Sequence, residues 1–195
     1  MTVQEVLSLF KQTEALLEGH FQLTSGLHSP QYFQCAKVLQ YPQHATALCA
    51  EIAKHFERSK VDVVVAPALG GIVVGQEVGR QLGVRTMFTE RKENAMQLRR
   101  GFEIHADERV LVCEDVVTTG GSVAEVIGIV KQAGGKVLGV GYIVDRSGGT
   151  VKFDIEKEGL QFASLHMDVV TYKPEECPLC MKRIPVLKPG SRGKG

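Results

Sequence analysis

Hydrophobic positions in the first third of the chain follow a helical pattern, then an extended one, then a helical one again. Apolar residues recur at helical spacing over residues 3–17, and Thr2 and Glu5 have the spacing of a capping box at the start of this helix. We expect the helix to end at Gly19. Turn signals within residues 20–35 separate two short segments that we interpret as strands. A second helix is expected from Pro42 to Arg58, because proline suits the first helical position.

From residue 61 onward, short apolar runs rich in valine alternate with helical stretches. Runs without a polar face are typical of strands buried on both sides, as in a parallel sheet covered by helices. The pattern therefore predicts an α/β domain built on a parallel sheet. The expected strands are residues 61–66, 86–89, 109–113 and 136–144, and the expected helices run from the glycine pair after Pro67 to near Gly83 and from 121 to 133.

Composition and charge narrow the class of protein. The chain has 195 residues, 44% of them hydrophobic, with 23 Lys plus Arg against 22 Asp plus Glu. These values favour one globular domain and argue against a nucleic-acid partner bound through bulk charge. The apolar stretch Val61–Val74 is interrupted by a charge, a proline and two glycines, so we expect no membrane partner. No secretion signal is recognisable and the five cysteines are odd in number, so we expect a cytoplasmic protein.

One segment combines an acidic pair with a loop suited to phosphate. A buried run ends at Glu114 and Asp115, and Thr-Thr-Gly-Gly-Ser at residues 118–122 then opens a helix. Helix N-termini bind phosphate through free N–H groups, whereas carboxylates accept hydrogen bonds from sugar hydroxyls or hold a hydrated cation, so a ribose phosphate fits both parts. Taken alone, the loop also fits an ordinary helix start. The segment lacks the Walker lysine and the GxGxxG spacing, which argues against an NTPase or a dinucleotide site.

Two further segments carry candidate chemistry. Residues 66–72, Ala-Pro-Ala-Leu-Gly-Gly-Ile, again follow the order of strand, small residues and helix. Such a turn is common without a binding role, but two loops of this kind in one sheet favour a phosphate site more than one does. Residues 90–101 form a polar connection that holds Arg91, Lys92, Arg99 and Arg100. A charged loop is usually a solvated surface, but together these four side chains are able to neutralise a polyanion.

The strand, acidic pair and Thr-Thr-Gly-Gly-Ser loop resemble the signature of type I phosphoribosyltransferases. Residues 19–33 are similar to the hood segment of the orotate phosphoribosyltransferase family, and residues 142–147 are similar to its arginine-bearing strand end. With the Cys-Pro-Leu-Cys tail, the chain resembles the short bacterial form nearly from end to end. The resemblance implies a central, mostly parallel sheet flanked by helices, within a single domain over residues 1–195. It also implies a hood of about residues 1–40 plus the C-terminal tail, and a core of about residues 42–172.

The resemblance implies roles for individual residues. The acidic pair would contact the ribose hydroxyls of phosphoribosyl pyrophosphate, residues 118–122 its 5′-phosphate, and residues 68–71 its pyrophosphate. The donor residues so implied are Ala68, Leu69, Gly70, Gly71, Glu114, Asp115, Val116, Val117, Thr118, Thr119, Gly120, Gly121 and Ser122; the orotate residues are Thr118, Arg146, Tyr32 and Phe33; and the catalytic residues are Arg91, Lys92, Arg99, Arg100 and Asp115.

The implied reaction forms orotidine 5′-monophosphate and pyrophosphate in pyrimidine biosynthesis. Its cofactor is Mg²⁺, held mainly by the substrate and not directly by protein ligands. In the family a basic loop closes over the active site of the neighbouring subunit in a homodimer. This sequence departs from the family pattern, because Ala95 and Gln97 stand where the family has a lysine and a histidine. We hypothesise that Arg99 and Arg100 supply the missing charge.

Two other functions remain open at this point. A purine or xanthine phosphoribosyltransferase shares the acidic loop but not the hood segment. A regulator that binds phosphoribosyl pyrophosphate without catalysis would fit the altered basic loop, although the sequence shows no helix-turn-helix or basic recognition helix.

The tail carries Cys177 and Cys180 in a single CxxC, without the second pair that makes such spacing convincing as a zinc site. We interpret it as a tail motif without an assigned role, and zinc shared across a dimer or a redox pair as the alternatives. The six histidines show no metal-ligand spacing, so we expect surface or structural roles for His20 and His28.

Overall fold

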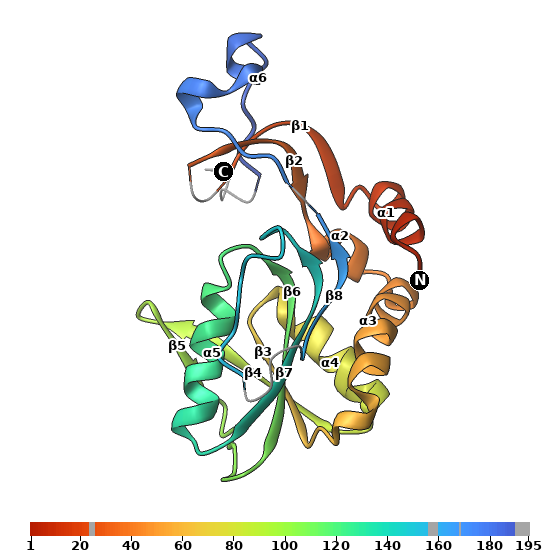
Figure 1. The fold of residues 1–195 in the computed structure, drawn as a ribbon, viewed down its shortest axis with the longest axis vertical. Helices are drawn as coiled ribbons and strands as arrows, with labels where there is room; N and C mark the ends of the chain where they lie inside the picture. The colour runs from red at the N-terminus through yellow and green to blue at the C-terminus, as the bar shows by residue number, and fades with distance from the viewer. Residues whose placement is uncertain (24–25, 156–159, 168, 190–195) are drawn as a thin grey trace.

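The computed structural model describes the chain apart from residues 24–25, 156–159, 168 and 190–195. Its centre is a six-stranded sheet in the order β5-β4-β3-β6-β7-β8, in which only the edge strand β5 is antiparallel to its neighbour (Figure 1). The strands are β3 (Val63–Pro67), β4 (Arg85–Lys92), β5 (Ala95–Leu98), β6 (Arg109–Val117), β7 (Lys136–Asp145) and β8 (Gln161–His166). The predicted α/β fold with a mostly parallel sheet is therefore confirmed.

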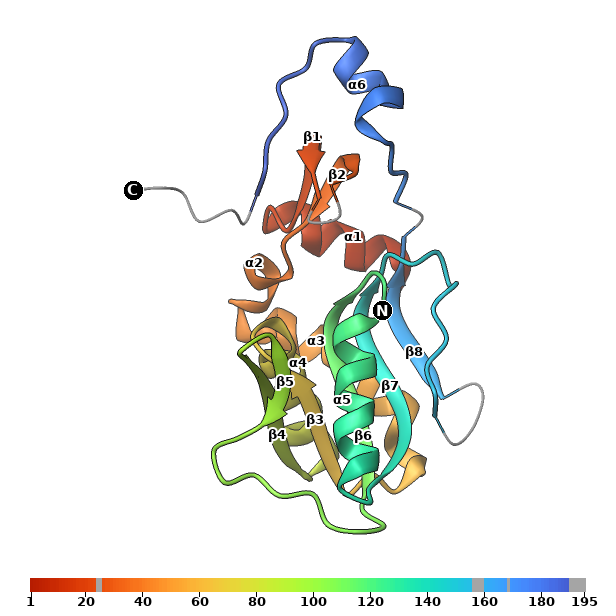
Figure 2. The ribbon, with the colours of Figure 1, turned by 90° about the vertical axis from the view of Figure 1, so that its left-hand side faces the viewer.

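Helices cover both faces of this sheet. The helices α3 (Pro42–Phe56) and α4 (Gly70–Leu82) pack on one face, and α5 (Gly121–Gln132) packs on the other, as Figure 2 shows. Short helical segments complete the chain: α2 (Cys35–Leu39), η1 (Glu57–Ser59), η2 (Pro174–Glu176) and α6 (Pro178–Met181). No helix in the described part of the chain is long and apolar enough to cross a membrane.

The apolar runs of the sequence correspond to strands that are buried on both faces. Along β3, Val64 points into the hydrophobic core under α3 and α4, whereas Val63 and Val65 point into the core under α5. The same alternation holds along β6, where Leu111 and Val112 face opposite cores. Successive side chains of a strand point to opposite faces, so a sheet covered on both sides needs apolar residues at every position.

The N-terminal helix is shorter than predicted. The helix α1 spans Val3–Gln12, with the predicted capping box, and the chain leaves it through Glu14 at a φ of 52°. Leu16 instead begins strand β1 (Leu16–Gln22), which pairs antiparallel with β2 (His28–Phe33). The predicted helix to residue 17 with a stop at Gly19 is wrong, because Leu17 fits the helical spacing but its backbone pairs with β2. The two short strands expected here are confirmed.

The segment predicted as a polar connection is instead a β-hairpin. Strand β4 continues to Lys92, and β5 returns antiparallel to it after Glu93 and Asn94, both of which have positive φ. Two such residues form the tight turn that matches the twist of paired strands. Strand β6 also extends beyond the expected limit to Val117, so the acidic pair lies within the strand and not in the loop after it.

The β1-β2 ribbon and the tail form a layer beyond the carboxyl ends of the parallel strands (Figures 1 and 2). The tail pairs with both edges of the ribbon: Tyr172 and His28 exchange two backbone hydrogen bonds of 2.8 Å each, and the backbone of Leu187 bonds to His20 and Gln22. From here on, the name hood is kept for this ribbon together with residues 169–189, which is a smaller set than the hood expected from the sequence.

Candidate active site

The loop between β6 and α5 forms a small phosphate-sized cavity. Residues 116–123 and Glu114 line a volume of about 70 Å³ at the N-terminus of α5. Gly120 precedes the helix with a φ of 75°, and a Cβ atom there would collide with Val151 and Phe153. Only glycine therefore allows this turn, which leaves the first N–H groups of α5 free to bind an anion.

The acidic pair lies directly beside the second glycine-containing loop. A Cβ atom at Gly70 would overlap the carboxylate of Asp115, and one at Gly71 would lie 2.9 Å from Glu114 Oε1. The loops meet because β3 and β6 are neighbours in the sheet, so their carboxyl ends lie at the same edge. The structure thus brings Gly70 and Gly71 of the predicted pyrophosphate loop beside the acidic pair, as expected for residues that bind one ligand.

The environment of the acidic pair limits its negative charge. Burial, reinforced by the neighbouring carboxylate of Asp115, raises the pKa of Glu114. Glu114 accepts a hydrogen bond from the backbone N–H of Asp115 at 3.0 Å, and Asp115 accepts one from Val116 at 2.9 Å. With the pKa of one member raised, the pair holds less than its full negative charge near neutral pH, which favours an approaching polyanion.

A larger cavity of about 700 Å³ lies between the hood and the carboxyl ends of β6 and β7. It is lined by Tyr32 and Phe33 of β2, by Thr118 beside the phosphate loop and by Arg146 after β7, which are the four residues predicted for orotate. Its volume lies within the ordinary range for small-molecule sites. Val116 and Thr119, which were predicted for the donor, also line it, whereas four further lining residues were missed because they carry no local signal of this role: Leu23, Leu27, Val169 and Thr171.

Among the described residues that line this cavity, Arg146 carries the one positive charge. Its guanidinium carbon lies 5.7 Å from the ring centroid of Phe33, within range of a cation–π interaction. Its Nε is buried and has no hydrogen-bond partner in the described part of the chain, and burial lowers the pKa of the guanidinium. A buried donor without a partner is costly, so the cavity is suited to a ligand that brings an anionic acceptor.

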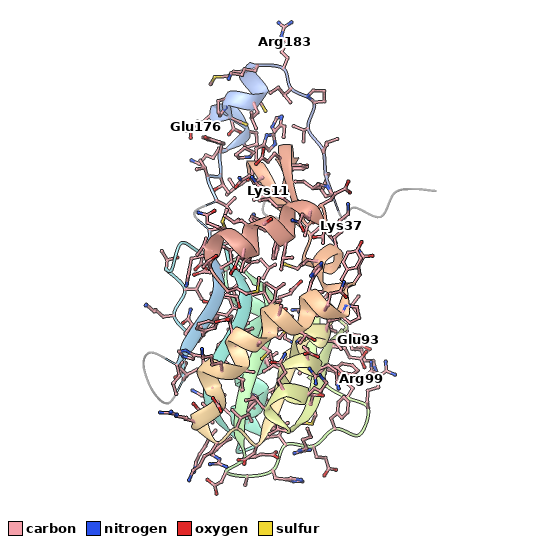
Figure 3. All side chains as sticks on the ribbon, turned by 90° about the vertical axis from the view of Figure 1, so that its right-hand side faces the viewer. Lys11, Lys37, Glu93, Arg99, Glu176 and Arg183 are labelled. Carbon is pink, nitrogen blue, oxygen red and sulfur yellow. The ribbon has the colours of Figure 1, made fainter. Side chains whose placement is uncertain are left out.

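Two of the four predicted basic residues, Arg91 and Lys92, end β4, and the other two, Arg99 and Arg100, directly follow β5; none of them lines either of these two cavities. Arg91 pairs with Glu125 at 2.6 Å, and Lys92 lies 4.0 Å from Glu93. Figure 3 shows Glu93 and Arg99 at the side of the molecule, far from the hood tip that carries Glu176 and Arg183. Within one chain, the structure does not bring these side chains to the acidic pair.

The remaining two basic residues share one acidic partner. Arg99 and Arg100 both pair with Glu90, at 3.2 and 2.9 Å. Glu90 lies in β4 and the two arginines directly follow β5, so the shared carboxylate holds the arginines next to each other.

Comparison with known proteins places these features in a family. Residues 37–171 match the family model of the phosphoribosyl transferase domain. The orotate phosphoribosyltransferase of Chlorobaculum parvum is 59% identical over 192 residues, which are 98% of this chain and 97% of that protein. The chain belongs to the orotate phosphoribosyltransferase family. A second member, from Desulforamulus reducens, is 53% identical over 98% of both chains.

Solved structures agree with the fold of this phosphoribosyltransferase. The orotate phosphoribosyltransferase of Aeropyrum pernix superposes with a TM-score of 0.68 at 23% identity, over 83% of this chain and 93% of that chain. The adenine phosphoribosyltransferase of Thermoanaerobacter pseudethanolicus superposes with a TM-score of 0.66 at 16% identity, over 85% of this chain and all of that chain. At these identities the structures support the fold and do not select the base.

Proposed function

We propose that the chain transfers the phosphoribosyl group of phosphoribosyl pyrophosphate to orotate, forming orotidine 5′-monophosphate and pyrophosphate. The observation that carries this assignment is the buried, unpartnered Nε of Arg146 in a cavity adjoining the phosphate loop. Val116, Thr118 and Thr119 line both cavities, so a sugar phosphate in one and a base in the other would meet at these residues.

The donor would span the two glycine-containing loops. Its 5′-phosphate would bind the N–H groups and hydroxyls of residues 118–122. The ribose hydroxyls would donate hydrogen bonds to Glu114 and Asp115, and the pyrophosphate would lie along residues 68–71, whose glycines adjoin the acidic pair. This arrangement directs C1 of the ribose toward the larger cavity.

Orotate would bind in the larger cavity, with its carboxylate on the guanidinium of Arg146 and its ring against Phe33 and Tyr32. A ring nitrogen of the bound base then forms a bond to C1, while the bond from C1 to the pyrophosphate oxygen breaks with its electron pair, and C1 is inverted. No protein nucleophile is required. The protein accelerates the reaction by aligning the two substrates and by holding the departing charge.

Magnesium fits the donor side of this site. Mg²⁺ prefers oxygen ligands and keeps waters and substrate phosphates around it, and the carboxylates of Glu114 and Asp115 adjoin the proposed pyrophosphate loop. When bound, the cation supplies positive charge to the departing pyrophosphate. The two acidic side chains would orient the hydrated cation through their oxygens, without serving as its main ligands.

The same proposal includes a homodimer in which the β4-β5 hairpin of one subunit closes over the site of the other. It is supported by four basic side chains on and directly after this edge hairpin, which pair with carboxylates and do not line the two cavities of their own chain. We also place the protein in the cytoplasm, where a reducing environment suits five cysteines that form no disulfide.

The test is a base-selectivity assay. Purified protein is mixed with phosphoribosyl pyrophosphate and Mg²⁺, and loss of orotate absorbance is followed beside parallel reactions with adenine, hypoxanthine, xanthine and uracil. Turnover confined to orotate supports the proposal. Turnover with a purine would retain the donor site and reject the assignment of Arg146 to orotate. Binding of the donor without turnover would identify a regulator.

A further inference from the structure

Four side chains with metal-binding groups converge in the hood, outside the proposed active site. His20 of β1, His28 of β2, Cys177 directly before α6 and Cys180 within α6 each offer one ligand atom, and these four atoms all lie within 4.8 Å of one another. We infer that these four residues form a structural zinc site within a single chain. The inference goes beyond the proposed function and does not depend on it.

The distances suit one tetrahedral ion. With ordinary zinc–nitrogen and zinc–sulfur bond lengths, neighbouring ligand atoms of a tetrahedral site lie about 3.3–3.8 Å apart. Cys177 Sγ lies 3.5 Å from His20 Nε2, and Cys180 Sγ lies 3.7 Å from the same nitrogen and 3.3 Å from His28 Nδ1. The two histidine nitrogens are 2.8 Å apart and need to separate by about 0.5 Å to hold the ion.

The surroundings of His20 prepare it as a ligand. Its second ring nitrogen, Nδ1, lies 2.7 Å from the carbonyl oxygen of Ile184 and donates its proton there when Nε2 is the ligand atom. Metal-binding histidines commonly donate their other N–H to a backbone carbonyl, which sets the tautomer and the ring orientation. Ile184 follows α6, so the same tail segment that provides both thiols also orients the first imidazole.

The composition of the site indicates a closed, structural zinc centre. Two thiolates and two imidazoles are a ligand set typical of tetrahedral Zn²⁺ and fill all four positions, which leaves none for a substrate. His20, His28 and Cys177 are buried, and Cys180 is half-buried, so the ion would be shielded from solvent. The alternative is a disulfide between the two cysteines, which would leave the histidine pair without a ligand role.

The tail is joined to the ribbon by backbone hydrogen bonds but buries few side chains. Within residues 169–189, all of which the structure describes, Cys177 is the one buried residue, and Met181 and Leu187 are exposed. A segment that buries so little apolar surface needs another source of stability, and a structural metal is a common one. The ion would join the tail to β1 and β2 at the tip of the hood (Figure 2).

The site would therefore support the roof of the larger cavity. Strand β2 carries both His28 and the cavity residues Tyr32 and Phe33, while the tail contributes Thr171. Tyr172, next in the chain, pairs with the backbone of His28. Loss of the ion is expected to loosen these contacts, because metal binding free energy at such sites is folding free energy.

Metal content tests the inference directly. Untagged protein is purified under reducing conditions from cells supplied with zinc, and metal is measured by mass spectrometry, with the expected result of about one zinc per chain. Replacement by Co²⁺ should give the intense visible absorption of a tetrahedral site and a sulfur-to-cobalt charge-transfer band. Protein that binds no zinc after reconstitution with the reduced thiols, or cobalt that binds without the charge-transfer band, would overturn the inference.

Two variants and two matched controls locate the site. Cys180→Ser and His28→Ala should each lose zinc and have a lower melting temperature. Met181→Ala and His105→Ala change exposed residues outside the cluster, and they should retain the zinc content and the melting temperature of the wild type. If a variant does not fold, the wild-type protein is treated with a chelator instead. Release of zinc should then make two thiols, those of Cys177 and Cys180, reactive at the same time. Metal content is read without an activity assay, so failure of the proposed function leaves this test intact.

Discussion

The guanidinium of Arg146 lies over the ring of Phe33, at 5.7 Å from the ring centroid, although one residue follows β7 of the sheet and the other ends β2 of the hood. Both residues line the larger cavity between the two layers. Their contact holds a positive charge in a partly apolar site, where an anionic ligand gains most from it.

Replacing Arg146 should impair orotate use specifically. Arg146→Ala removes a charge-assisted contact worth about 3 kcal/mol, so kcat/KM for orotate should fall roughly 100-fold or more. The KM for phosphoribosyl pyrophosphate should change little. Arg146→Lys should recover only part of the loss, because lysine lacks the planar fork. Steady-state kinetics measure these changes, and Arg80→Ala, which removes an exposed arginine of α4, is the control. An equal loss of kcat/KM in the control would show that the loss is not specific to Arg146.

Gly70→Ala should damage the donor side of the site. The new Cβ would overlap the carboxylate of Asp115, so either the loop or the carboxylate must move, and the KM for phosphoribosyl pyrophosphate should rise at least 10-fold. Gly128→Ala is the matched control, since a Cβ there meets nothing within 4 Å. That control should leave the kinetics unchanged and stabilise α5 by about 0.5–1 kcal/mol. Equal kinetics for both variants would contradict the assignment of the loop.

Removing both charges of Arg99 and Arg100 should lower kcat much more than it weakens orotate binding. The reason is that the two arginines are proposed to hold the departing pyrophosphate and not the base. A double alanine variant is assayed for kcat and for orotate affinity separately. Retention of full activity would reject the hypothesis that they replace the family lysine and histidine.

The shared site can be tested by mixing two inactive variants. If the hairpin acts on the partner subunit, subunits with Arg99 and Arg100 replaced and subunits with Arg146 replaced should form heterodimers with one intact site. Random exchange should then restore about a quarter of the wild-type activity. Activity that stays at the level of the separate variants after verified subunit exchange would show that the hairpin does not act across a dimer.

Glu114 should make the folded state less stable as pH rises. Its pKa is raised in the folded protein, so the folded state binds the proton more tightly than the unfolded state does. Stability is therefore lost as pH rises from the ordinary glutamate range through the raised pKa. Glu114→Gln should unfold at a higher temperature than wild type near pH 8 and match it near pH 4, whereas exposed Glu103→Gln should follow wild type throughout. A wild-type advantage at pH 8 would contradict this sign.

Local patterns of the sequence were sufficient for the centre of the fold and the donor loops. The strands β3 and β6 follow from uninterrupted apolar runs, because burial on both faces leaves no polar position. The turn at Gly120 and the free N–H groups that follow it are set by a few adjacent residues, so they too are visible in the sequence. The four residues expected for orotate were found through family resemblance and indeed line one cavity.

Features that depend on distant residues were decided only by the tertiary structure. Leu17 fits a helix by spacing, yet pairing with β2 places it in a strand. The polar segment after β4 has no apolar pattern of its own, and becomes a strand by pairing along the sheet edge. His20 and Cys177 are 157 residues apart, and the single CxxC offers only half of a ligand set. Spacing predicts contacts only within an element, whereas folding of the tail over the ribbon places these groups side by side.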